Sequence, residues 1–429
     1  MKKKVKIAYI FTRFPCLTQL FALREVEELR RLGIDVQPYS LNRVQAEEMQ
    51  DSLMKFWFDK TIYVPSSSSF QCLVSLSKIS IKHFRIFWGG LIVKYISGNI
   101  QNLRYLFASL AVFSQATHIT QELVKTNVMW IHAHFATNAT TVAWIIKHLS
   151  GIPYSFTPHA YDIFKREFQT EFLKTKIQDA HFVVAESQFN KFFLQNFSEQ
   201  KSENGRYPVI HCGVGADYLH RQLKKDYKNP FPIILCIARL VEKKGHEYLI
   251  RALDIIKQQA LDFKCIMVGN GPLKEQLINQ VKEKKLEDRV EFVGEFSPVQ
   301  VRDILERADI FCLPCIHANS GDRDGIPVAL MEAMAKRLPV ISTHMKGITE
   351  LIRSGDNGLL VPERDEKALA DALITLLKSA NLRSRLAEAG YNTIHEYFNS
   401  QKETTKLYQI FLEQLKERNI MDNEYGFDS

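Results

Sequence analysis

No stretch of the sequence approaches the roughly 20 consecutive apolar residues that a transmembrane helix needs. Cysteine is scarce, with seven among 429 residues. Because this number is odd and most cysteines lie in apolar runs, the composition favours a reducing compartment over a disulfide framework. Met1-Lys2-Lys3-Lys4 is basic, but no signal-peptide apolar segment or small-residue cleavage site follows it. We therefore expect a cytoplasmic protein without a membrane span.

Two motif classes are missing as well. The turn Gly269-Asn270-Gly271-Pro272 lacks the third glycine of a dinucleotide fingerprint, and no matching downstream acid is found, which argues against an NAD-dependent oxidoreductase. No DNA- or RNA-binding motif is present. The net charge of +8 fits an acidic substrate or an anionic membrane better than nucleic acid, so no nucleic-acid partner is expected.

Acidic residues are absent from residues 60–121, which contain six Lys or Arg and many aromatics. Basic amphipathic helices of this kind can lie in a membrane interface. Alternatively, the segment forms core helices of the first domain with a solvated basic face. Because the imbalance is one-sided, we predict contact with an anionic membrane surface and a peripheral location on the inner face of the cell membrane.

Strand-like apolar runs alternate with amphipathic helical patterns along most of the chain; among them we expect strands at 180–185 and 207–211 that complete the first domain's sheet, and an amphipathic helix at 366–378. This alternation predicts α/β domains with parallel sheets, and the length predicts two of them. A polar, charged, proline-containing stretch follows residue 216 and marks the boundary. We predict a first domain of residues 1–216, completed by the terminal helix within 401–429, and a second domain of residues 217–400.

The most informative stretch begins with an apolar strand at 310–313 and a polar loop. Gly325-Ile326-Pro327 then opens a helix to about Lys336, with Pro327 in the first turn, and a strand follows at 338–342. Open α/β sheets bind ligands at the carboxyl ends of their strands. Helix-start amides and the helix dipole favour a phosphate there. The amides concerned are those of Gly325, Ile326 and Val328.

Asp324 and Glu332 are eight residues apart, just over two helical turns. Two acids at this spacing could hold two parts of one elongated ligand, such as a sugar at Asp324 and a ribose at Glu332. The alternative is structural: Asp324 caps the helix, and Glu332 is a solvated helix residue. The spacing alone leaves both open.

The segments DGIPVALMEAMAKRLPVIST at 324–343 and GITELIRSGDNGLLVPERD at 347–365 resemble the nucleotide-sugar signature of family 4 (group 1) glycosyltransferases, nearest to the colanic-acid or exopolysaccharide type. The resemblance implies a GT-B fold, with two Rossmann-like domains whose parallel sheets face each other across a cleft. It also implies a retaining sugar transfer. The family has Glu where this chain has Asp324, and Gly at the position of Arg337. A left-handed Arg337 would cost on the order of 1 kcal/mol.

Other segments extend the resemblance. RLVEKKG at 239–245 matches the family's R-L-x-x-x-K-G, which implies that Arg239 and Lys244 bind the diphosphate. HAHFA at 132–136 and SFTPHAYDIF at 155–164 resemble first-domain motifs, which implies that His159 meets the donor sugar or its phosphate. The resemblance thus assigns His159 and Asp324 as catalytic. The nucleotide-sugar-binding residues are Arg239, Lys244, Asp324, Gly325, Ile326, Val328 and Glu332.

No metal or other cofactor is expected. His132 and His134 lie on one strand face but lack a third ligand. The C-x-x-C at 312–315 ends a strand without a matching helix start, and the D-x-D at 322–324 fits the family signature better than a metal site.

The implied partners are a nucleotide-diphosphate sugar and a glycan or lipid-linked acceptor, in exopolysaccharide or lipopolysaccharide-type synthesis. A catalytically silent paralogue that acts as a binding subunit is the alternative. It stays open because Asp324 and the loop Phe14–Phe21 depart from the family pattern.

Overall fold

The structure is a computed structural model of the whole chain, and it describes residues 4–16, 19–49, 51–65, 103–165, 167, 170–199, 205–219 and 231–418. The chain divides into two compact units. Unit 1 comprises Met1–Ile210 and Lys402–Ser429, and unit 2 comprises His211–Gln401. Each unit has its own parallel sheet and its own hydrophobic core.

Unit 1 is built on five parallel strands in the order β3-β2-β1-β4-β5. They are β1 (Lys6–Arg13), β2 (Asp35–Asn42), β3 (Ile62–Tyr63), β4 (Trp130–His134) and β5 (Tyr154–Thr157). β2 and β3 extend the sheet on one side of β1, and β4 and β5 extend it on the other. The loops after β1 and β4 therefore leave the carboxyl edge of the sheet in opposite directions. Open α/β sheets bind ligands at the point where the strand order reverses in this way.

Alternate residues of β1 serve two cores, because successive strand side chains point to opposite faces. Ala8 and Ile10 pack with α6 and α7, whereas Ile7, Tyr9 and Phe11 pack with α1, α2 and α19. The helices of unit 1 are α1 (Leu20–Arg31), α2 (Ser52–Lys60), α6 (Leu103–Leu123), α7 (Asn138–Ser150), α8 (Ala160–Phe164), α9 (Glu171–Asp179), α10 (Gln188–Ser198) and α19 (Ser400–Glu417), with a 3₁₀ turn η2 (Ala46–Glu48).

Unit 2 has six parallel strands in the order β11-β10-β9-β6-β7-β8. They are β6 (Ile233–Ile237), β7 (Lys264–Val268), β8 (Val290–Gly294), β9 (Ile310–Cys312), β10 (Val340–Thr343) and β11 (Leu359–Val361). The chain builds outward from β6 to β8 and then returns to place β9 on the other side of β6. This reversal is a topological switch point between β6 and β9.

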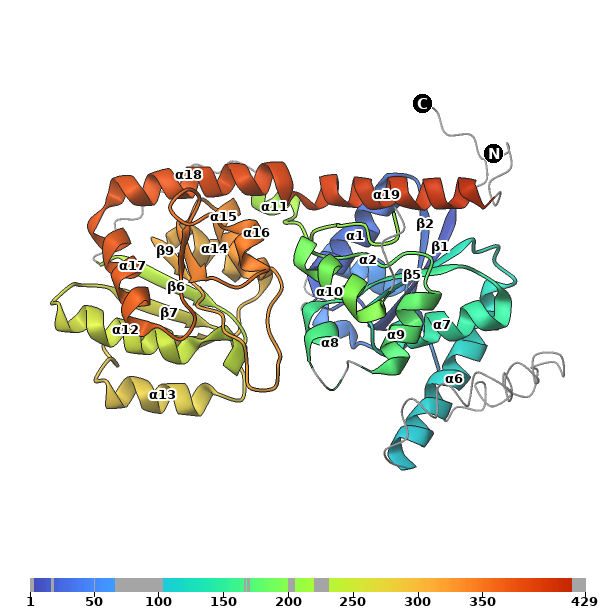
Figure 1. Cartoon of the computed structure of the whole chain (residues 1–429), viewed down its shortest axis with the longest axis horizontal. Helices are drawn as coiled ribbons and strands as arrows, with labels where there is room; N and C mark the ends of the chain where they lie inside the picture. The colour runs from blue at the N-terminus through green and yellow to red at the C-terminus, as the bar shows by residue number, and fades with distance from the viewer. Residues whose placement is uncertain are drawn as a thin grey trace. The chain divides into compact units, whose positions relative to one another are not determined.

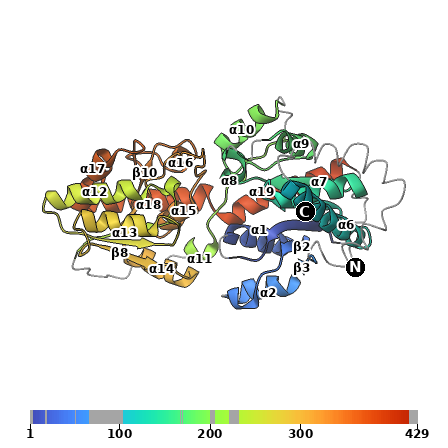
Figure 2. The same ribbon diagram turned by 90° about the horizontal axis from the view of Figure 1, so that it is seen from below.

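Helices flank the unit 2 sheet (Figures 1 and 2). α12 contacts α13 and α17, whereas α15 contacts α18, and both α15 and α17 contact β10. The helices are α11 (Ala216–Leu219), α12 (His246–Gln258), α13 (Lys274–Glu283), α14 (Pro298–Arg307), α15 (Val328–Ala335), α16 (Ile348–Leu351), α17 (Glu366–Lys378) and α18 (Ala380–Tyr397), with a 3₁₀ turn η5 (Glu242–Lys244).

Two predicted features differ from the structure. Pro327 is the N-cap of α15 rather than a first-turn residue, since its ψ is 122° and its carbonyl accepts the Leu330 amide at 3.1 Å. The segments 180–185 and 207–211, expected as sheet strands, form only isolated bridges, Phe156 with Val183 and Ala185 with Val209. Single bridges do not make a ladder, so unit 1 has a shorter sheet than predicted.

The basic segment 60–121 is only partly described: residues 66–102 lie outside the described residues. Among the helices that the structure does describe, none combines the length and apolar character needed to cross a bilayer. The predicted contact with a membrane surface stays a prediction.

Candidate functional site

Lys244 is held at the switch point of unit 2 by a close approach of two loops. β6 ends at Ile237, and η5 and Gly245 follow. Gly245 has a φ of 67°, and a Cβ there would lie 1.9 Å from the carbonyl oxygen of Pro314 in the loop after β9. Only glycine lets the two loops come this close. The sequence RLVEKKG thus places Lys244 against the loop that carries Asp324.

The Asp324 carboxylate contacts two lysines. Lys244 Nζ lies 2.7 Å from Asp324 Oδ2, and Lys243 Nζ lies 3.4 Å from Oδ1. The Cys315 thiol donates to Oδ2 at 3.3 Å. α15 has no side-chain cap, because its N-cap is Pro327. The alternative that Asp324 caps this helix is therefore wrong.

The ion pair between Asp324 and Lys244 is largely buried, with 12% and 16% of the side chains exposed. Burial raises the pKa of Asp324, but Lys244 and then Lys243 outweigh it and lower the pKa below its usual 3.8. Burial lowers the pKa of Lys244, but Asp324 outweighs it and raises the pKa above 10.5. Both groups are therefore charged at neutral pH, and Lys244 offers a fixed positive charge.

The start of α15 lies directly beyond this pair. The first-turn amides of a helix have no partner within the helix, which gives this end its affinity for anions. Gly325 is buried, and Gly347 packs so tightly on it that a Cβ at Gly347 would lie 2.3 Å from its carbonyl oxygen. Ile326 and Val328 are partly exposed. The predicted phosphate-binding amides and the charged pair thus belong to one continuous segment.

The two remaining predicted residues of unit 2 are more open. Arg239 is exposed and lies just after β6, on the same loop as Lys244. Glu332 is partly exposed and lies about one turn beyond the start of α15. Arg239 is therefore placed near the diphosphate-binding features by its loop. The roles assigned to these residues stay predictions.

His159 follows β5 and is the N-cap residue of α8 in unit 1. Its amide donates to Asp162 Oδ1 at 2.7 Å, and the rings of Phe21 and Phe135 both pack against its side chain, with centroids 4.7 Å and 4.2 Å away. Nδ1 lies 2.8 Å from Glu186 Oε1, and Nε2 lies 3.3 Å from His134 Nδ1. Both ring nitrogens of the predicted catalytic histidine therefore have partners inside unit 1.

Glu25 is the residue of this cluster that sequence reasoning missed. Its Oε1 lies 3.0 Å from His134 Nε2 and accepts a hydrogen bond from the Tyr9 hydroxyl at 2.8 Å. In α1 it lies three residues after buried Ala22 and four before buried Leu29. These spacings put a carboxylate on the buried face of an amphipathic helix. This pattern was the signal in the sequence that could have identified Glu25.

Glu25, His132 and His134 lie close enough together to consider a metal ion. However, His132 Nδ1 lies 2.8 Å from the Ser155 hydroxyl, and Nε2 lies 3.1 Å from that of Thr157. Burial lowers the pKa of His132 to about 3, so its ring is neutral. Because both of its nitrogens are already engaged, the cluster fits a hydrogen-bond network better than a metal site.

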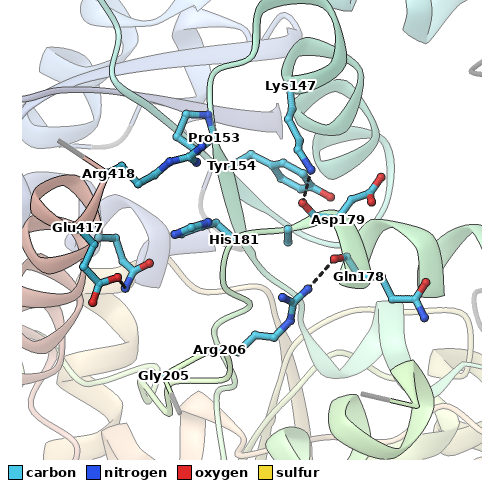
Figure 3. A pocket seen from close by; sticks show the side chains of 12 residues that line it. Lys147, Pro153, Tyr154, Gln178, Asp179, His181, Gly205, Arg206, Glu417 and Arg418 are labelled. Carbon is cyan, nitrogen blue, oxygen red and sulfur yellow. Dashed lines mark hydrogen bonds between the residues drawn. The ribbon is translucent and has the colours of Figure 1, made fainter. Parts of the chain in front are cut away.

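A cavity of about 460 Å³ lies elsewhere in unit 1, at the amino end of β5 (Figure 3). Lys147 and Arg206 point into it, but both donate to the last carbonyls of α9: Lys147 to Asp179 at 2.6 Å, and Arg206 to Gln178 at 2.6 Å. Cations at this end of a helix stabilise its unpaired carbonyls. These side chains therefore have a structural role, and the cavity lies at the opposite edge of the sheet from His159.

Part of the chain is similar in sequence to known glycosyltransferases. Residues 220–393 match the family model described as glycosyl transferases group 1. The amylovoran biosynthesis glycosyltransferase AmsK of Erwinia amylovora is 42% identical over 168 residues, which is 39% of this chain and 41% of that protein. The putative colanic acid biosynthesis glycosyltransferase WcaL of Salmonella typhimurium is 44% identical over 164 residues, 37% of this chain and 40% of that one.

The likeness in fold extends over nearly the whole chain. The structure of Anabaena Alr3699/HepE in complex with UDP-glucose superposes with a TM-score of 0.69 at 17% identity, covering 96% of this chain and 99% of that one. The fold is therefore GT-B, built from two Rossmann-like α/β units. The sequence matches are shorter, since they span about two fifths of the two curated relatives named above.

Proposed function

We propose that this protein transfers a sugar from a nucleotide-diphosphate donor, because residues 220–393 match the family model of glycosyl transferases group 1. The acceptor is a glycan or a lipid-linked glycan of exopolysaccharide or lipopolysaccharide-type synthesis. The observation that carries the proposal is the buried pair of Asp324 and Lys244 at the switch point of unit 2, beside the start of α15. A fixed cation beside the start of a helix at this position suits a diphosphate.

Each residue has a role in the proposal. Lys244 and Arg239 neutralise the diphosphate, Lys as a point charge and Arg as a bidentate donor. Amides of Gly325, Ile326 and Val328 bind the β-phosphate. Glu332 holds the ribose. The charge of the leaving group is met by protein cations, so the proposal includes no metal or other cofactor.

Asp324 orients Lys244 in the proposal and reaches toward the donor sugar, and His159 acts on the sugar or its phosphate. Transfer proceeds with retention: the acceptor oxygen bonds to the anomeric carbon on the face from which the phosphate leaves. The bond between that carbon and the phosphate oxygen breaks, and the acceptor proton passes to the departing phosphate. Transfer with inversion in a product analysis by NMR would contradict this step.

The experiment that tests the proposal uses purified full-length protein and a panel of nucleotide sugars. Selective donors should raise the melting temperature, because a ligand that binds only the folded state stabilises it. With a suitable acceptor, the same donors should release nucleoside diphosphate. Binding without any turnover would favour a binding subunit, and no binding by any donor would overturn the proposal.

Lys244→Ala sharpens this test. The variant should weaken binding of a nucleoside diphosphate by roughly 1–3 kcal/mol, typical of a lost charge-assisted contact, and should hardly change binding of the nucleoside. Lys282→Ala, an exposed lysine in the last turn of α13, is the matched control. Equal losses for nucleoside and diphosphate in Lys244→Ala would remove Lys244 from the diphosphate site.

We propose that residues 60–121 attach the protein to an anionic membrane surface, where a lipid-linked acceptor would be found. The excess of six Lys or Arg over no acidic residue supports this. The protein should sediment with vesicles that contain anionic lipid and leave them at high salt, because salt screens such attraction. Equal sedimentation with neutral and anionic vesicles would contradict the proposal.

A further inference from the structure

Four side chains of unit 1, two buried histidines and two partly exposed carboxylates, form one continuous chain of polar contacts at the carboxyl edge of its sheet. The chain runs from Glu186 to His159 at 2.8 Å, from His159 to His134 at 3.3 Å, and from His134 to Glu25 at 3.0 Å. His159 and His134 are 8% and 1% exposed, so water does not supply substitute partners. The two carboxylates lie at the ends and the two imidazoles in the middle.

The order of these groups fixes how many protons the rings carry. An ionised carboxylate only accepts hydrogen bonds, so His159 Nδ1 and His134 Nε2 must both carry a proton. The middle contact joins His159 Nε2 to His134 Nδ1 and needs a third proton, because two facing lone pairs would leave both nitrogens buried and unsatisfied. Two neutral imidazoles carry only two protons. One of the two rings is therefore an imidazolium.

We propose that Glu25 is a positioning residue that acts through His134 to keep a proton on His159 Nε2. Glu25 accepts a hydrogen bond from the Nε2–H of His134, so His134 keeps its proton on Nε2 and presents the lone pair of Nδ1 to His159. With Glu186 holding the Nδ1 proton, His159 Nε2 is then a hydrogen-bond donor and never an acceptor. This role rests on the proposed function, in which His159 meets an oxygen of the donor.

The charges around the chain support this arrangement. Burial lowers the pKa of His159, but Glu186, then Asp162 and Glu25, outweigh it and raise the pKa above 6.5. Burial raises the pKa of Glu25, but His134 outweighs it and brings the pKa to about 2. Glu25 is therefore ionised at any pH at which the enzyme would work.

Other titratable groups packed around the two rings are consistent with one extra proton. Tyr9 on β1 has its pKa raised by burial and by Glu25, so it stays a neutral donor to that carboxylate. His132 on β4 is neutral, and burial raises the pKa of Asp162 on α8 to about 6. Burial lowers the pKa of Lys176 on α9, which lies near Asp162, to about 8. The imidazolium is thus matched by carboxylates on α1, on α8 and at Glu186.

A hydrogen-bond donor at His159 Nε2 has a use in sugar transfer. The contact to His134 is the longest of the three, at 3.3 Å, and is the one that a substrate oxygen can replace. A sugar hydroxyl or a phosphate oxygen accepts from an N–H, and a charged donor strengthens this bond. A neutral His159 with its lone pair on Nε2 would repel a phosphate oxygen instead.

Nitrogen NMR of the histidine side chains tests the proposal directly, because protonated and bare ring nitrogens differ strongly in chemical shift. In the wild-type protein at pH 7, His159 should show both nitrogens protonated, and His134 should show a proton on Nε2 alone. His159→Asn and His134→Asn assign the signals. A bare Nε2 on His159 at pH 7 would overturn the proposal without any variant of Glu25.

Glu25→Gln removes the negative charge of the carboxylate, and either the oxygen or the NH₂ group of the new amide can face His134. The His159 ring should then lose its extra proton at a pH lower by up to about one unit, because an opposite charge in direct contact shifts a pKa by about one to three units and Glu25 reaches His159 only through His134. Glu28→Gln is the matched control: it is on the same helix, with its carboxylate 3.5 Å from Arg31 rather than in contact with a histidine. An unchanged His159 titration in Glu25→Gln would overturn the proposal.

The pH dependence of sugar transfer tests whether this proton matters for the reaction. A reaction that needs the extra proton declines as pH rises through the raised pKa of His159, and in Glu25→Gln this decline should begin at lower pH. The effect should appear in kcat more than in KM, because nucleotide binding belongs to unit 2. If no donor supports transfer, the proposed function fails, whereas the NMR result still decides the proton assignment. Normal transfer in Glu25→Gln over the whole pH range would refute the positioning role.

Discussion

Asp324 has a structural task in unit 2 besides the functional one proposed for it. Its carboxylate is largely buried and binds Lys244 at 2.7 Å, so removing its charge takes the buried counter-ion from Lys244, whereas Lys243 keeps its contact with Asp322. Breaking a buried ion pair from one side costs on the order of 3 kcal/mol. Asp324→Asn should therefore lower the free energy of unfolding in urea at pH 7 by about this amount.

The pH dependence of that loss follows from the direction of the pKa shift. The pKa of Asp324 is lower in the folded state than its usual 3.8, so its contribution to stability is complete above that value and is lost as pH falls through the folded pKa. The stability difference between wild type and Asp324→Asn should narrow below about pH 4. Asp322→Asn, which removes a carboxylate bound to Lys243 alone, is the control. A difference that is constant with pH would contradict the charged pair.

At the scale of elements, the sequence predicted most helices and strands, because their signals are local. α17 was expected at 366–378 and is observed over Glu366–Lys378. Arg337, in the place of a family glycine, has a φ of 55°, as expected. Its guanidinium lies 3.5 Å from the Tyr391 ring centroid and contacts Glu388 at 2.9 Å. These contacts offset part of the free-energy cost of the left-handed backbone at Arg337. No local sequence pattern could have predicted them.

In the candidate site, too, the sequence predicted the residues that lie in local motifs and not the contacts between distant elements. The motif placed Lys244 and Asp324 in one site, and the structure brings them into contact. The Glu25 network was not predicted, because it joins α1, β4 and α8, elements far apart in the sequence. A pairing of this kind depends on strand order, and strand order is a property of the whole sheet. His159 was identified, but its two internal partners were not.

At the scale of the whole molecule, the chain leaves unit 1, forms unit 2 and returns with α19. Leu407, Phe411 and Leu415 of α19 are buried in the unit 1 core, where the Phe411 ring centroid lies 6.1 Å from that of Trp130. All four tryptophans of the chain precede residue 211, so tryptophan fluorescence reports on unit 1 alone. Circular dichroism reports on both units. The two probes together can therefore assign a loss of stability to one unit.

Phe411→Ala should destabilise unit 1 by about 3–5 kcal/mol, the cost of deleting a buried aromatic ring. The midpoint of unfolding in urea should fall when it is followed by tryptophan fluorescence, while the part of the dichroism signal that comes from unit 2 should keep its midpoint. Leu373→Ala, at a fully buried position of α17 in the unit 2 core, is the matched control. It should lower the midpoint of the dichroism signal from unit 2 and leave the midpoint followed by tryptophan fluorescence unchanged. If both variants shift both probes equally, the two units unfold as one cooperative body. If Phe411→Ala leaves the fluorescence transition unchanged, α19 does not belong to the unit 1 core in solution.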